Sequence, residues 1–207
     1  MHSQSLPRFA LLALGACFVL PVGCGSDPQP LPPKVATGLD GLRSEAIALK
    51  GQIEKVTAAL SDLMQKPQAD LQPQSWSFTQ ELAVLEGRLE RAQAQRQVAD
   101  NMVLEQFAAW DSQLDQLQSE EAKDLAAERR SATTQTLDGI QKSIEGLREK
   151  FAPFLTDLRD VRQYLKGDLS LPGLETMKPV AQRVFAAQGA ILGGLDGVVA
   201  SITAAIG

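Results

Sequence analysis

Apolar residues recur along this chain in steps that alternate between three and four positions. The first such run lies between residues 37 and 66 and comprises Leu39, Leu42, Ala46, Leu49, Ile53, Val56, Leu60 and Leu63. Strict alternation of this kind is typical of a helix that packs lengthwise against another helix. We therefore predict a helix over 37–66 that stops at Pro67, and a loop over 65–75.

A second helix is predicted from about Trp76 to residue 118, with Ser75 or Ser77 as its N-cap. Its apolar seam weakens at Arg96 and then resumes with two successive steps of four, a stutter that locally unwinds a coiled coil. The seam comprises Phe78, Leu82, Leu85, Leu89, Ala92, Ala99, Val103, Phe107, Trp110, Leu114 and Leu117.

Two more helices complete the pattern. Ser119 precedes two glutamates, which favours a helix start, so we expect a turn near 118–120; one uninterrupted helix is the alternative. The third seam comprises Leu137, Ile140, Ile144, Leu147, Phe151, Phe154, Leu158, Val161 and Leu165. Pro153 predicts a bend around 149–153, and the helix should end near Gly167. The last helix is expected from about Pro172 to Ala205.

These four seams predict one all-α domain over residues 37–207. Short loops make neighbouring helices antiparallel, and each apolar stripe must be buried on a neighbour. We therefore expect an elongated antiparallel helical bundle with coiled-coil heptads, four long helices and a kink in the third near Pro153. No alternating strand pattern and no glycine-rich phosphate loop occurs.

The N-terminus resembles a lipoprotein signal. Arg8 is followed by an apolar run over residues 9–23, and two small residues precede Cys24. We predict a signal peptide over 1–23, lipidation at Cys24, and a proline-rich tether over 24–36. This places the protein in the bacterial cell envelope, anchored by lipid, at the periplasmic face of the outer membrane.

Two alternatives to this signal stay open. Leu14-Gly15-Ala16-Cys17 fits the lipidation motif more closely, but cleavage there would leave an apolar stretch on the processed chain. A plain signal anchor without lipidation is the other alternative.

Composition argues against catalysis. Processing at Cys24 would remove both Cys17 and His2, the only histidine. Metal sites and most nucleophilic triads use histidine or cysteine, so we expect no enzyme, no metal and no cofactor. An enzyme would have to use carboxylates, Lys, Ser or the single Tyr164, as glycosidases use two carboxylates. The net charge of −5 also argues against nucleic-acid binding.

FAPFLTDLRDVRQYLKGDLS, residues 151–170, resembles the most characteristic stretch of an uncharacterised family of proteobacterial helical lipoproteins, a domain of unknown function. Gap-free matches are Pro153, Leu155, Asp160, Leu165, Lys166 and Leu169. The chain has Gly167-Asp168 where the family has His-Asn, and Ser170 where it has Asn. FAAWDSQL, residues 107–114, is similar to the family's Phe, Trp and Leu pattern. The resemblance implies a helical envelope lipoprotein, and brings no activity, substrate or cofactor.

Three groups of residues are candidates for recognition. Trp110 and Trp76 could anchor a partner, although core packing at the bundle ends is favoured. A polar cluster could form a recognition surface, although i,i+4 pairing along the helix is favoured; it comprises Arg159, Asp160, Arg162, Tyr164, Lys166 and Asp168. Residues 128–130, Glu-Arg-Arg, are either a docking patch or a solvated face.

The C-terminal segment 189–207 is apolar and rich in small residues. Gly189, Gly193 and Gly197 recur every four positions, which predicts close helix–helix packing. Membrane insertion is the alternative, and Asp196 argues against it.

Two functional classes follow. We expect a structural or protein-interaction bundle, with a protein partner or homo-oligomer formed through a coiled coil. The alternative is a binding module for an apolar ligand or lipid in the bundle interior.

Overall fold

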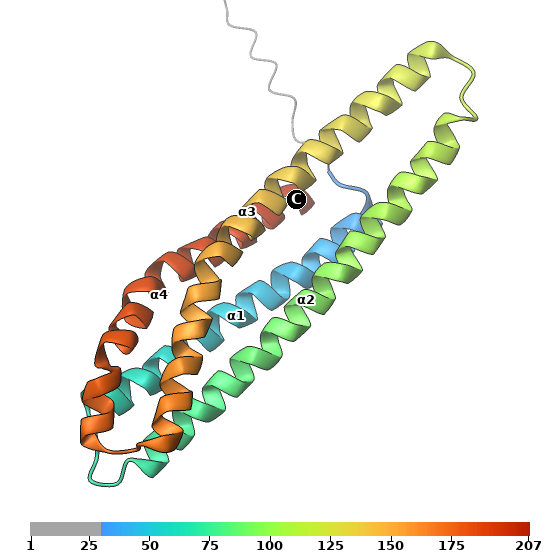
Figure 1. The fold of residues 1–207 in the computed structure, drawn as a ribbon. Coiled ribbons are helices and arrows are strands. Elements are labelled where there is room, and N and C mark those ends of the chain that lie inside the picture. The colour runs from blue at the N-terminus through green and yellow to red at the C-terminus, as the bar shows by residue number, and fades with distance from the viewer. Residues whose placement is uncertain (1–29) are drawn as a thin grey trace, which may run out of the picture.

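The computed structural model describes residues 30–207, which form four long antiparallel helices (Figure 1). The helices are α1 (Pro33–Gln65), α2 (Gln72–Leu114), α3 (Glu120–Gly167) and α4 (Leu171–Ile206). No strand occurs within residues 30–207. The predicted fold class, an elongated all-α bundle, is confirmed.

Helix α1 begins earlier than predicted. It starts at Pro33 rather than Thr37, because a proline in the first helical turn has no N–H to leave unpaired. Leu31 and Val35 are buried, 6% and 1% exposed. The end of the predicted tether therefore packs on the bundle.

Helix α2 also begins earlier, at Gln72 rather than Trp76, with Pro73 in its first turn. Neither Ser75 nor Ser77 is the N-cap, so that prediction is wrong. The buried side chain of Gln74 closes the α1–α2 turn instead. Its amide donates to the backbone oxygens of Asp62 and Lys66, and its Oε1 accepts from a loop N–H.

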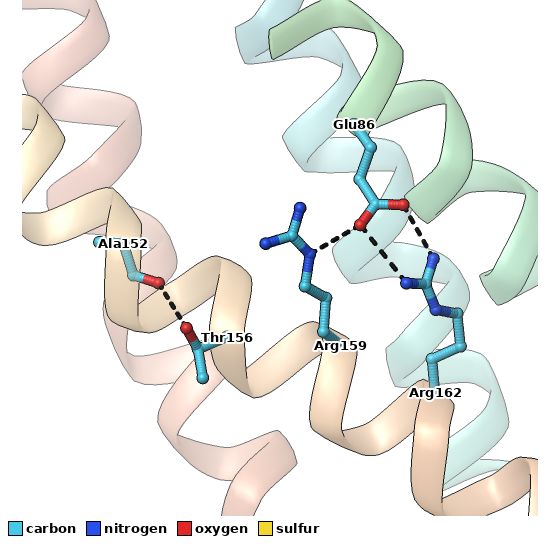
Figure 2. A network of polar contacts seen from close by, with 5 residues as sticks. All are labelled: Glu86, Ala152, Thr156, Arg159 and Arg162. Carbon is cyan, nitrogen blue, oxygen red and sulfur yellow. Dashed lines mark hydrogen bonds and ion pairs between the residues drawn. The ribbon is translucent and has the colours of Figure 1, made fainter. Parts of the chain in front are cut away.

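The turn predicted near 118–120 separates α2 from α3, and one uninterrupted helix is excluded. Ser119 is the N-cap, accepting a hydrogen bond from Ala122 N. Helix α3 continues through Pro153, and Figure 1 shows its axis changing direction along its length. The Thr156 hydroxyl donates to the Ala152 carbonyl at 3.1 Å (Figure 2). A proline and a back-bonded threonine in one turn both favour a bend.

The helices are arranged around the bundle in the order α2, α1, α4, α3. Helix α1 packs closely on α2 and α4, and α3 packs on α4, whereas α2 and α3 barely touch. The main core comprises Ile53, Val56, Leu60, Leu63, Phe78, Leu82, Leu85, Phe154, Leu158, Val161, Val184 and Ile191, among others. A second cluster lies near the C-terminus and comprises Leu31, Val35, Leu39, Leu42, Ile140, Val198 and Ile202.

The end of α2 and the start of α3 continue past α1 and α4 as a two-helix extension (green to yellow in Figure 1). Leu125 on this extension is 61% exposed. The extension therefore lacks the partners that bury apolar side chains elsewhere in the bundle.

The glycine repeat on α4 does not make the close packing that was predicted. A Cβ atom built at Gly189, Gly193 or Gly197 would meet nothing within 4 Å. Helix α4 is long and apolar enough to cross a membrane by length and composition alone, while one of its faces packs in the bundle core. Asp196 pairs with Lys50 of α1 at 2.7 Å.

Candidate functional site

A groove of about 550 Å³ lies where α2 and α3 fail to pack. All four helices contribute to it, with α2 and α3 as walls and α1 and α4 as the floor. Its lining comprises Leu42, Ala46, Leu49, Leu89, Ala92, Gln93, Arg96, Ile144, Leu147, Arg148, Phe151, Ala152, Leu155, Leu195 and Val198. Most of these side chains are apolar, so the groove is an apolar surface with access from solvent.

The groove is open because the α2 wall carries small or polar residues. The α2 seam reaches Leu89 and Ala92 and then meets Gln93 and Arg96, where the sequence pattern also weakens. On α3 the apolar seam continues across this level through Ile144, Leu147 and Phe151. The mismatch between the two seams leaves space that neither helix fills.

A polar clasp closes the groove at one end (Figure 2). Glu86 of α2 accepts from Arg159 Nε at 2.7 Å and from Arg162 Nη1 at 2.9 Å, both on α3. Burial of the carboxylate opposes its ionisation, but the hydrogen bonds from Arg162 and Arg159 outweigh that effect. The pKa of Glu86 therefore lies below its ordinary value of 4.5.

A second clasp lies toward the other end. Arg96 of α2 donates to Gln141 Oε1 of α3 at 2.8 Å, and its Nε lies 3.7 Å from Asp100. Polar contacts therefore hold α2 and α3 together on both sides of the groove.

The extension has its own link between the two helices. Arg130 of α3 pairs with Asp111 of α2 and lies over the Phe107 ring, 5.1 Å from its centroid. Phe107 in turn stacks on Trp110, with ring centroids 5.6 Å apart.

The predicted polar cluster divides into two stripes on α3. Arg159 and Arg162 face α2 and form the Glu86 clasp. Asp160 lies near Arg183 of α4. The pKa of Arg183 is raised mainly by its hydrogen bond to Asp157, and the negative charge of Asp160 raises it further. Arg159 and Arg162 therefore pair across helices, and the favoured i,i+4 pairing is wrong for these two arginines.

The remaining members of that cluster lie at the α3–α4 end. Tyr164 and Lys166 are exposed, and Asp168 Oδ1 accepts from the Ser170 hydroxyl at 2.6 Å. Ser170 also caps α4 through Gly173 N. Trp110 lies at the opposite end of the molecule, so the candidate residues do not form one surface.

Two other predictions about side chains have different outcomes. Trp76 is 67% exposed, so its expected core packing is wrong. In the 128–130 segment, Arg130 holds Asp111 and Arg129 donates to the Pro30 carbonyl. These arginines therefore connect parts of the chain with one another.

Residues 30–207 contain no group of three or more His, Cys, Asp or Glu side chains that could hold a metal ion. Cys24, the predicted lipidation site, and the alternative Cys17 lie outside the described residues. The groove itself offers amide and guanidinium groups as its only polar chemistry.

No protein-family model, curated protein or solved structure matches the chain. The resemblance of residues 151–170 to a lipoprotein family therefore stays a prediction.

The sequence pattern does not predict the position of this groove, although it leaves an apolar site in the bundle interior as an alternative. The one available signal was the weakened seam at Arg96. It coincides with the place where α2 stops contributing apolar side chains to the α3 side.

Proposed function

We propose that this protein is a lipid-anchored binding protein of the bacterial cell envelope that holds an apolar chain in the α2–α3 groove. The observation that carries the proposal is the groove itself, about 550 Å³ in volume and walled mainly by Leu, Ile, Phe and Ala side chains. Its volume lies within the roughly 300–1,000 Å³ of typical ligand sites. The envelope location rests on the signal-like sequence that ends at Cys24.

The polar groups of the groove support binding rather than catalysis. They are Gln93, Arg96 and Arg148. A guanidinium stays protonated and an amide does not titrate, so neither serves as a nucleophile or a general base. They can orient a ligand by hydrogen bonds and charge.

An interaction protein is the second candidate, favoured by two exposed apolar side chains, Leu104 beside the start of α1 and Leu125 on the extension. A partner or a second copy could cover them. The two candidates place the contact at different parts of the chain, so mapping a contact distinguishes them.

The test is photo-cross-linking with the full chain in lipid nanodiscs. The probe is a neutral long-chain alcohol with a diazirine in its tail, and labelled residues are mapped by mass spectrometry. We expect labels on the groove walls, 89–96 and 144–155. Filling the groove with Ala92→Leu and Ala152→Leu together should remove them, whereas Ala127→Leu on the exposed side of α3 should not.

Labels that fall on the extension and persist in the filled variant would favour the interaction protein. Labels scattered over the molecule, unchanged by filling, would contradict the groove as a binding site.

A further inference from the structure

The charge of the groove is opposite to that of the chain. The protein carries a net charge of −5, yet the lining contains two arginines and no acidic side chain. The only other polar group there is the neutral amide of Gln93. A long apolar surface with cations and no anions is complementary to a molecule that has an apolar tail and a negative head.

The two arginines differ in how they are held. Arg96 is fixed by Gln141 and Asp100. Arg148 lies exposed on the opposite wall, and among residues 30–207 it has no ion-pair or hydrogen-bond partner. Its guanidinium is therefore available to a ligand without breaking an existing contact. A guanidinium matches a carboxylate in a two-point hydrogen-bonded pair.

We propose that the groove binds a single-chain fatty carboxylate, with its tail on the apolar walls and its carboxylate at Arg148. This inference rests on the proposed function and names the chemistry of its ligand. A single tail suits the volume of about 550 Å³, in the lower half of the range of ligand sites. One free guanidinium matches one negative charge.

The experiment compares two diazirine probes with identical tails, one ending in a carboxylate and one in a hydroxyl. Both are mixed in equal amounts with the full chain in nanodiscs, at about pH 9, where the carboxyl is ionised. We measure the ratio of acid to alcohol labels on the groove walls, 89–96 and 144–155. A charge-assisted pair predicts about tenfold more acid label.

The variants test the position of the head. Arg148→Gln should lower the acid label to the level of the alcohol and leave the alcohol label unchanged. Arg148→Lys should keep part of the preference, because the charge stays but the two-point geometry is lost. Lys142→Gln, which removes a charge elsewhere on α3, is the matched control and should change neither label.

The outcomes separate this inference from the function on which it rests. Equal labelling of the groove by both probes would overturn the carboxylate assignment and leave apolar binding intact. An acid preference that survives Arg148→Gln would also overturn it. Absence of groove labelling by either probe would contradict the proposed function as well.

Discussion

The contacts that α1 makes with its neighbours differ from the contact between α2 and α3. Along α1 the contacts are close and mainly apolar, and Ile53, Val56 and Leu60 are fully buried. Between α2 and α3 the contact is sparse and polar, through the Glu86 clasp and Arg96. The same bundle therefore contains closely packed interfaces around α1 and an interface between α2 and α3 that polar side chains bridge and that leaves the groove open.

The difference follows from how many neighbours each apolar seam must cover. Helix α2 has one seam, and its fully buried members Phe78, Leu82 and Leu85 belong to the main core beside α1. Few large apolar side chains remain on the flank that faces α3. Charged and polar side chains then make the contact between α2 and α3, and the groove stays open between these contacts.

The largest expected effect is a loss of stability when a side chain in the closely packed interface around α1 is shortened. Leu60→Ala should lower the free energy of unfolding by about 2–5 kcal/mol, because it leaves a cavity in packed surroundings. Leu155→Ala on the groove wall removes the same atoms from a half-open site and should cost about 1 kcal/mol. Urea unfolding of the full chain, followed by circular dichroism, measures both. Equal losses would show that the two interfaces are packed alike.

The second prediction concerns the polar clasp. Glu86→Gln should lower the free energy of unfolding by about 1–2 kcal/mol at neutral pH, since it removes the charge that Arg159 and Arg162 share. Glu90→Gln, one turn further along α2, is the control and should change it little.

The effect of Glu86→Gln depends on pH in a defined direction. The pKa of Glu86 in the folded protein lies below 4.5. Its carboxylate therefore stabilises the fold at every pH above the pKa that Glu86 has in the unfolded chain. This contribution is lost as the pH falls through the lowered folded pKa. Wild type and variant should therefore converge in acid. A difference that persists unchanged into strong acid would rule out the charge as its source.

The helices were predictable because three-four spacing has only one simple meaning, a helix with a buried stripe. The starts of α1 and α2 were not, and the reason is proline. Pro33 and Pro73 indicate tether and loop in the sequence, but both lie in first turns, where no N–H is needed. Ser119 was assigned correctly because an acidic pair follows it.

The groove and its polar clasps could not be predicted from the spacing of apolar residues, for a different reason. Spacing tells that a stripe is buried, and does not tell which helix covers it or whether the cover is complete. Glu86 carries no local mark of its role, because its partners lie 73 and 76 residues later in the chain. The glycine repeat on α4 has the spacing of a contact, but no neighbour faces it.

That glycine repeat gives the third prediction. Gly193→Ala should raise the free energy of unfolding by about 0.5–1 kcal/mol, because the site is helical and open. At Gly194 a new Cβ would lie 2.9 Å from Leu147 Cδ1, so Gly194→Ala should gain less. Urea unfolding measures both. Destabilisation by Gly193→Ala would indicate that another surface packs on this face.

The smallest expected effect is at Trp76. It lies two positions before Phe78 on α2, yet it is 67% exposed where Phe78 is 1% exposed. Trp76→Ala should change the free energy of unfolding by no more than about 0.5 kcal/mol, whereas Phe78→Ala should lower it about as much as Leu60→Ala does. The same unfolding measurement decides it. If Trp76→Ala lowered the free energy of unfolding about as much as Phe78→Ala, the tryptophan would have to be buried. Another surface would then have to cover the start of α2.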